Sequence, residues 1–196
     1  MLLRRAGVRS VVLAAAAVLT TATLAAPAEA RTARGVIVIG DSLTVQAQPY
    51  LPTGWTVSGQ NGREVAALPG ALDTNLGEQR VPRVLVLALG QNESKGWTRD
   101  GYRAAANTVP NSTAVLFVNT YRDPAFFGDR RAATQAAYSR WMARLAATQP
   151  NVQVIDWRGA VLDGAVTLPD GSHPDEAGAQ YRAKLTLGAV RAALRG

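Results

Sequence analysis

The chain contains a single histidine, His173, three residues after Asp170 in the segment LPDGSHPDEAG. A carboxylate bound to one imidazole nitrogen leaves the other free to act as a base. Such a base can activate a serine hydroxyl, which is too weakly acidic to attack unaided. Ser42 is the candidate hydroxyl, because it lies just after the apolar run GVIVIG at 35–40, where a buried strand has to turn into a helix. The three residue types together predict nucleophilic catalysis by a serine.

A second group of residues offers hydrogen-bond donors for negative charge on a reacting oxygen. Asn92 follows the run RVLVLALG, and a side-chain amide exposed there can donate to an oxyanion. Gly62, in SGQNGREV, lets a backbone N–H approach a substrate without obstruction by a side chain. Arg63 beside it is expected on the surface rather than as a clamp for an anion. On the segment GDS alone, an ordinary turn with Ser42 as a helix cap is an equally good interpretation.

The predicted elements determine where these residues lie. Apolar, β-rich runs alternate with longer alanine-rich stretches, an order typical of a parallel sheet covered by helices on both faces. Strands are expected at 35–40, 55–59, 83–90, 113–120 and 152–157, and helices at 63–77, 98–108, 128–148 and 175–195. Functional residues of open parallel sheets collect in loops beyond the carboxyl ends of the strands. Ser42 and Asn92 would both lie in such loops.

The predicted helix at 128–148 has a two-sided pattern of residue types. Its buried side is expected to carry Ala132, Ala136, Trp141 and Leu145, and its solvated side Arg130, Arg131, Arg140 and Arg144. No repeat or linker interrupts residues 31–196, which is a suitable length for one domain with a full core.

Four segments, in this order, resemble the SGNH hydrolase family, also called the GDSL esterases. They are GDSL at 40–43, a glycine in the second segment, GQN at 90–92 and DGSH at 170–173, and they span nearly all of the chain after residue 30. The resemblance implies an α/β fold, a three-layer α/β/α sandwich around a five-stranded parallel, flavodoxin-like sheet. The VNTY and VIDW stretches are more similar to SGNH domains related to cell-envelope O-acyltransferases than to the larger lipases of the family.

The resemblance also implies a role for each matching residue. Ser42 would be the nucleophile, His173 its base, and Asp170 the group that orients His173. The oxyanion hole would comprise the Ser42 backbone N–H, Gly62 and Asn92, with Gly59 as a weaker candidate for the second position. The general α/β-hydrolase elbow, Gly-x-Ser-x-Gly, is disfavoured because Thr44 stands two residues after the serine.

Residues 1–30 have the pattern of a secretory signal peptide. Three arginines precede an apolar run from Val11 to Ala26, and small residues at Ala28 and Ala30 provide a cleavage site after Ala30. A retained membrane anchor is the weaker alternative, because the run is short and rich in alanine. We therefore expect an SGNH hydrolase domain over residues 31–196 that is secreted, either extracellular or associated with the cell envelope.

Composition limits the partners and cofactors. Residues 31–196 carry 18 basic and 13 acidic residues, a net charge of +5, without a basic run. This pattern predicts no nucleic-acid partner but favours electrostatic association with an anionic cell envelope. The chain has no cysteine, which excludes thiol redox chemistry and thiolate metal sites. Asp175 and Glu176 suit the start of the last helix better than a metal site beside His173, so we predict no metal. We also expect no cofactor and a monomeric chain.

The expected activity is hydrolysis of a short-chain, acetyl-type ester through a serine acyl-enzyme. The substrate would be a small ester or an ester on a cell-wall or extracellular glycan, because the short chain leaves little material for a lipid-binding lid. Two alternatives remain open. The same acyl-enzyme could pass its acyl group to a sugar hydroxyl, or the chain could be a non-catalytic module that binds the envelope, which the intact set of site residues argues against.

Overall fold

The five strands of the sheet are all parallel, and their order in space is β2-β1-β3-β4-β5. The computed structural model describes residues 33–77 and 81–195, and the predicted signal peptide at 1–30 lies outside them. The strands are β1 (Ala33–Gly40), β2 (Thr56–Gly59), β3 (Val81–Ala88), β4 (Ala114–Val118) and β5 (Val152–Ile155). The predicted parallel sheet is confirmed, and each strand begins and ends within two residues of its expected range.

Helices cover both faces of the sheet, as the alternation of elements predicted. Alternate side chains of a strand point to opposite faces. The isoleucines and leucines Ile37, Ile39, Leu85 and Leu87 lie in one core cluster, and the valines Val36, Val38, Val84 and Val86 lie in the other. The first cluster is completed by α2 (Leu68–Leu76), α3 (Arg99–Ala106) and α4 (Pro124–Ala146), and the second by α5 (Trp157–Leu162) and α6 (Glu176–Ala193).

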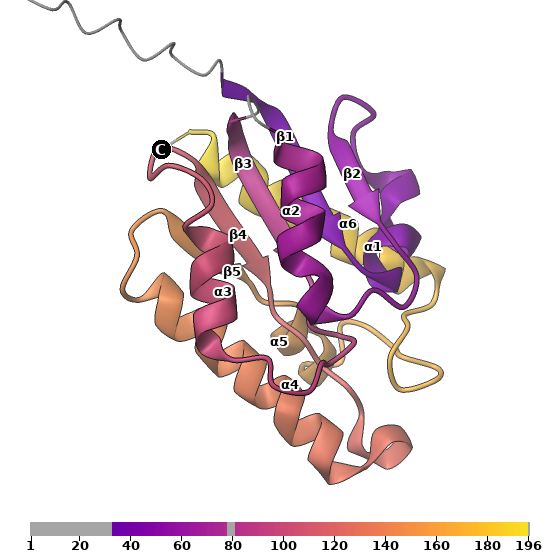
Figure 1. Cartoon of the computed structure of the whole chain (residues 1–196). Coiled ribbons are helices and arrows are strands. Elements are labelled where there is room, and N and C mark those ends of the chain that lie inside the picture. Colours follow the sequence, from indigo (N-terminus) through magenta and orange to yellow (C-terminus); the bar gives the residue numbers. More distant parts are fainter. Residues whose placement is uncertain (1–32, 78–80, 196) are drawn as a thin grey trace, which may run out of the picture. The chain divides into compact units, whose positions relative to one another are not determined.

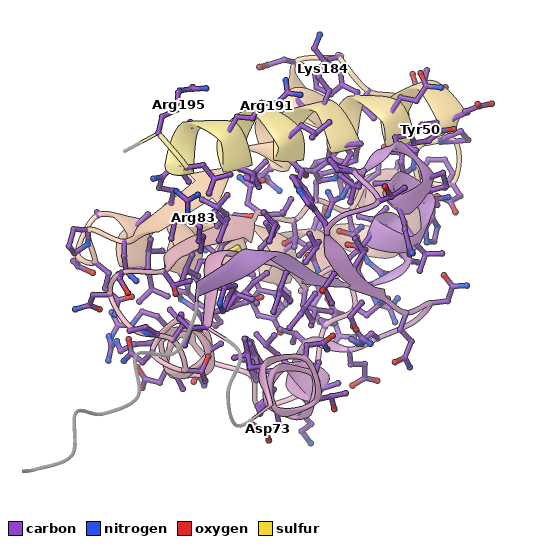
Figure 2. The ribbon with its side chains drawn as sticks, turned by 90° about the horizontal axis from the view of Figure 1, so that it is seen from above. Tyr50, Asp73, Arg83, Lys184, Arg191 and Arg195 are labelled. Carbon is purple, nitrogen blue, oxygen red and sulfur yellow. The ribbon has the colours of Figure 1, made fainter. Side chains whose placement is uncertain are left out.

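The figures show these three layers from two directions. Figure 1 looks onto the face covered by α2, α3 and α4, with α6 behind the sheet. In Figure 2 the sheet lies between α6 and α2, and Lys184 on α6 and Asp73 on α2 point outward on opposite sides. Within residues 33–77 and 81–195, no helix combines the length and the apolar character needed to span a bilayer.

The parallel register brings the carboxyl ends of three strands to one level. Gly40 at the end of β1 pairs with Gly59 of β2 on one side and with Ala88 of β3 on the other. The chain leaves this edge through α1 (Ser42–Ala47), through the segment 60–64 and through the segment 89–94. The three segments that carry the predicted serine, glycine and asparagine are therefore neighbours in space.

Helices α2, α4 and α5 differ from the expectations at their starts. Helix α2 begins at Leu68, five residues after the expected start at 63, and follows a short 3-10 helix at Val65–Ala67. Side-chain caps explain the other two starts. The predicted last strand ends at Ile155, and α5 begins at Trp157, because Asp156 Oδ1 accepts a hydrogen bond from the Gly159 N–H at 2.8 Å. Helix α4 begins at Pro124, four residues before the expected start, because Asp123 caps it through the Ala125 N–H at 2.8 Å. Gly128, with a φ of 76°, interrupts the helix after its first turn.

The buried side of α4 is more polar than predicted. Leu145 is buried as expected, but Ala132, Ala136 and Trp141 are only half-buried. The fully covered positions also include Gln135 and Ser139. Ser139 Oγ donates to the Thr120 carbonyl at 3.0 Å, and Gln135 Nε2 donates to the Gln91 carbonyl at 3.3 Å. These polar side chains satisfy backbone groups beyond the ends of β3 and β4, a requirement that helical periodicity does not reveal.

Replacing Gly40 by alanine tests the close approach of α1 to the end of β1. A Cβ at position 40 would overlap the buried side chain of Thr44 and lie 2.6 Å from its Cβ atom, so α1 would have to shift. We expect Gly40→Ala to lower the free energy of unfolding by about 1–3 kcal/mol in urea titrations. Gly70→Ala is the control, because a Cβ there meets nothing within 4 Å on an exposed face of α2, and it should raise stability by up to about 1 kcal/mol. Equal stability of the two variants would contradict the packing argument.

Candidate active site

Ser42 lies at the start of α1, directly beyond the carboxyl end of β1. Asp41 caps this helix, since its Oδ1 accepts a hydrogen bond from the Leu43 N–H at 3.1 Å. The backbone N–H of Ser42 is among the first N–H groups of the helix, which have no partner within it. The strand, the cap and the short helix thus fix both the hydroxyl and the backbone N–H of one residue at the edge of the sheet.

Ser42, His173 and Asp170 form one continuous hydrogen-bonded chain. Ser42 Oγ lies 2.9 Å from His173 Nε2, and His173 Nδ1 lies 2.8 Å from Asp170 Oδ2. A carboxylate can only accept, so Nδ1 carries the proton and Nε2 is left to accept the hydrogen of the serine hydroxyl. The arrangement presents the imidazole as a base toward Ser42.

The loop from Asp170 to His173 is folded around the Asp170 carboxylate. Asp170 Oδ1 accepts hydrogen bonds from the backbone N–H groups of Ser172 at 2.9 Å and His173 at 2.6 Å. Gly171 has a φ of 75°, and a Cβ there would lie 2.6 Å from the Phe126 ring of α4. The Gly171 carbonyl also accepts the Asp123 N–H at 2.9 Å. The start of α4 therefore holds this loop in place.

Several hydrogen bonds determine the ionisation of Asp170. Partial burial alone raises the pKa of its carboxyl. The hydrogen bonds from the backbone and ring of His173 and from the Ser172 N–H outweigh burial and lower the pKa from 3.8 to about 2. Asp170 therefore stays ionised at any pH at which His173 can act as a base.

The predicted donors line the same hollow as Ser42 and His173. This open cavity of about 620 Å³ is lined by Ser42, Val45, Gln46, Asn61, Gly62, Asn92, Asp170 and His173. Gly62 has a φ of 69°, a conformation that favours glycine. Gly59 does not line the hollow, because it is the last residue of β2 and pairs with Gly40 inside the sheet. The geometry thus favours Gly62 over Gly59.

Asn92 is held by partners on both sides of its amide. Its backbone carbonyl accepts the Val65 N–H at 2.9 Å, which links it to the segment after Gly62. Its Nδ2 donates to the Arg63 carbonyl at 3.3 Å, and its Oδ1 accepts from Arg122 Nη2 at 3.0 Å. An amide nitrogen has two N–H groups. One of them therefore remains for an acceptor in the hollow.

Three arginines near the hollow have structural roles that the sequence pattern did not indicate. Arg63 is neither a free surface residue nor an anion clamp, because its Nη1 donates to the carbonyls of Gly40 at 3.0 Å and Ser58 at 2.6 Å. It thus ties together the ends of β1 and β2. Arg122 is buried beside Asn92. Arg182 of α6 is buried near Asp41, with its guanidinium 4.7 Å from the centre of the Trp157 ring.

The charges of Asp41 and Arg182 influence one another beneath the helix that carries Ser42. Burial raises the pKa of Asp41, and the positive charge of Arg182 opposes this rise. Burial lowers the pKa of Arg182 to about 10, and the charge of Asp41 opposes this fall. No signal in the sequence distinguishes Arg182 from the other arginines of the predicted helix at 175–195.

The acidic residues after His173 form hydrogen bonds at the start of α6. Asp175 caps α6, as predicted, through the Gly178 N–H at 2.8 Å. Glu176 Oε1 accepts a hydrogen bond from the Tyr50 hydroxyl at 3.0 Å. In the part of the chain that the structure describes, no cluster of three or more His, Cys, Asp or Glu side chains is arranged to hold a metal ion.

The lowered pKa of Asp170 predicts a specific dependence of stability on pH. The folded chain stabilises the ionised carboxylate of Asp170, and the unfolded chain does not. The ionised group therefore contributes fully to the free energy of unfolding above the ordinary pKa of 3.8, and this contribution is lost as pH falls toward about 2. Urea titrations of wild type and Asp170→Asn across this range should give a difference in unfolding free energy that shrinks with falling pH. A difference that stays constant over the range would show that the carboxylate is not held in this way.

Comparison with known proteins identifies the fold. No family model and no curated protein matches the chain. Among solved structures, the catalytic domain of the Streptococcus pneumoniae peptidoglycan O-acetyltransferase A has 22% identity and a TM-score of 0.73, over 83% of this chain and 96% of that chain.

Two further structures match at lower similarity. A member of the lipolytic protein G-D-S-L family from Veillonella parvula has 15% identity and a TM-score of 0.59, over 80% of this chain and 97% of that chain. The acetylxylan esterase Axe2 from Geobacillus stearothermophilus, as a catalytic mutant, has 16% identity and a TM-score of 0.59, over 81% of this chain and 95% of that chain. Together with the parallel five-stranded sheet, these similarities show that the described residues, 33–77 and 81–195, have the three-layer α/β/α fold of the SGNH, or G-D-S-L, hydrolases.

Proposed function

We propose that the chain is a serine esterase that hydrolyses short-chain esters through an acyl-enzyme on Ser42. The observation that carries the proposal is the hydrogen-bonded chain from Ser42 Oγ to His173 Nε2, at 2.9 Å, and from His173 Nδ1 to Asp170, at 2.8 Å. It lies at the edge of an open hollow, where a carbonyl carbon can approach the hydroxyl oxygen. A hydroxyl in this setting has the base that it needs for attack.

The reaction proceeds in two halves. Ser42 Oγ attacks the ester carbonyl while His173 Nε2 takes its proton, and the carbonyl oxygen becomes an oxyanion. The backbone N–H groups of Ser42 and Gly62 and the side-chain amide of Asn92 donate to that oxygen. His173 then gives the proton to the departing alcohol, which leaves an acyl group on Ser42. In the second half, a water molecule gives a proton to His173 Nε2 as it attacks the acyl carbonyl. The acid product leaves as His173 returns that proton to Ser42 Oγ.

The residues around the hollow favour a small acyl group on a polar alcohol. Val45 is the one aliphatic side chain among the lining residues of this cavity, and Gln46 and Asn61 contribute amides. A long acyl chain would therefore contact only one aliphatic side chain among these residues. An acetyl ester on a glycan fits this lining. Two proteins that share the fold are a peptidoglycan O-acetyltransferase and an acetylxylan esterase, whose names place acetyl groups on polysaccharides.

The place of action follows from the same proposal. Residues 1–30 would direct export, and a net charge of +5 on residues 31–196 would favour association with an anionic envelope. The substrate would then be met outside the cytoplasm, as an ester on a cell-wall or extracellular glycan.

Acyl transfer to a sugar hydroxyl is the second candidate function. The observation that favours it is the TM-score of 0.73 with the O-acetyltransferase domain, against 0.59 with the acetylxylan esterase. Incubation of residues 31–196 with p-nitrophenyl acetate, butyrate and octanoate, with and without an acceptor sugar, separates the two. Hydrolysis that falls with acyl length and is unaffected by the sugar supports the esterase, whereas acetylated sugar found by mass spectrometry supports the transferase.

Variants of Ser42 and His173 test the shared acyl-enzyme mechanism. Ser42→Ala and His173→Ala should each remove almost all turnover of p-nitrophenyl acetate, and the double variant should be little worse, because residues that act as a unit are not additive. Circular dichroism should show that all three proteins fold. A folded Ser42→Ala protein with a rate near that of wild type would contradict the mechanism, whereas a folded wild-type chain without turnover would favour a module that binds without catalysis.

The amide of Asn92 should matter mainly in the transition state. Loss of one oxyanion donor typically lowers turnover by about 10²–10³, so Asn92→Ala should lower kcat by this factor and leave KM within a few-fold. Asn92→Asp should be at least as damaging, because a carboxylate repels an oxyanion. If Asn92 only holds its loop, both variants should instead lose thermal stability while the folded fraction keeps its kcat.

A further inference from the structure

The guanidinium of Arg122 lies directly behind the side chain of Asn92, on the side away from its donor nitrogen. Arg122 Nη2 donates to Asn92 Oδ1 at 3.0 Å, and Arg122 Nε donates to the Gln91 carbonyl at 2.8 Å. We propose that Arg122 is a positioning residue that fixes and polarises the Asn92 amide as an oxyanion donor. This inference rests on the proposed function, and it assigns a role to a residue that no sequence motif marks.

The orientation of the Asn92 amide depends on the chemistry of its two neighbours. Rotation about the last side-chain bond of an asparagine exchanges its oxygen and nitrogen, and both orientations are generally accessible. An arginine has five donors and no acceptor, so Arg122 can bind only Oδ1. The carbonyl of Arg63, 3.3 Å from Nδ2, can only accept, so it binds only the nitrogen. The wrong orientation would oppose donor to donor and acceptor to acceptor, and would turn an oxygen toward the developing oxyanion.

The charge of Arg122 also strengthens the donor that it positions. A positive charge on the oxygen side of an amide draws electron density from the nitrogen, and hydrogen bonds in series polarise one another. Arg122 is buried, where this effect is less screened by water. Burial lowers the pKa of Arg122, and the negative charge of Glu93 opposes this. A guanidinium retains its proton under all such conditions in proteins.

Contacts on the remaining sides hold the guanidinium in place. Its central carbon lies 4.4 Å from the centre of the Phe127 ring, a cation–π contact. Phe127 belongs to the first turn of α4, whose capping residue Asp123 donates its backbone N–H to the Gly171 carbonyl in the loop that carries His173. One short segment thus supports both the oxyanion donor and the base.

A double-mutant cycle with Asn92 tests the proposal. Arg122→Met should lower kcat for p-nitrophenyl acetate by about ten- to hundred-fold, less than the effect of removing the donor itself, with KM within a few-fold. In the Asn92→Ala background the same substitution should have almost no further effect, because no amide remains to be positioned. Arg122→Lys should keep more of the wild-type kcat than Arg122→Met, because an ammonium also donates to Oδ1 and keeps the charge.

Arg131→Met is the matched control. Arg131 is an exposed arginine of α4 that pairs with Glu93 at 3.4 Å, and no hydrogen bond joins it to Asn92 in the described part of the chain. The Arg131→Met substitution removes a nearby positive charge but leaves the hydrogen bond from Arg122 to Asn92 Oδ1, so the kcat of this variant should match that of wild type.

The outcomes separate this proposal from the proposed function. A wild-type kcat in folded Arg122→Met, or an equal loss in the Asn92→Ala background, would overturn the positioning role while the loss of activity in Ser42→Ala still supported the esterase. Activity that survives in Ser42→Ala would overturn the esterase itself. If Arg122→Met does not fold by circular dichroism, the same cycle is run with Arg122→Gln, which removes the charge but keeps a polar side chain: a loss of kcat that disappears in the Asn92→Ala background supports the proposal, and an additive or absent loss overturns it.

Discussion

The hydrogen bond between Ser42 Oγ and His173 Nε2 joins residues 131 positions apart, and the rest of the site depends on it. It forms because parallel register places the end of β1 level with the ends of its neighbours, and because α6 returns along the opposite face after the loop that carries His173. A displacement of that register would move Ser42 along the edge and break the bond. The register of the sheet thus determines how far apart the residues of the site lie.

Buried polar side chains make this edge rigid. Gln91 Nε2 donates to the Tyr121 carbonyl at 2.6 Å and to Ser172 Oγ at 2.9 Å, so the segment after β3 is bonded to the segment after β4 and to the histidine loop. Arg122 and Gln135 both donate to the Gln91 carbonyl. Breaking a buried hydrogen bond is costly, so these bonds favour one arrangement of the side chains that make them. Oxyanion donors are effective only when they are fixed before the reaction begins.

Sequence patterns predicted the parts of the molecule that depend on local spacing. Aliphatic runs identified all five strands, and the three-residue separation of Asp170 and His173 was sufficient to expect their contact, because a loop that short can fold back on its own carboxylate. The arginines could not be assigned in this way. Arg122 and Arg182 occupy buried sites because of partners from distant segments, whereas composition alone places an arginine on the surface. Helix α5 was likewise missed, since its start depends on the Asp156 side chain.

The central claim is that His173 makes Ser42 a nucleophile at the edge of this sheet. Reaction with a sulfonyl fluoride tests it most directly, because the sulfonyl group stays on an activated serine and can be located by mass spectrometry of peptides. We expect one added sulfonyl group per chain, on Ser42, and a much slower reaction in His173→Ala. Labelling at another residue, or an equal rate in His173→Ala, would contradict it.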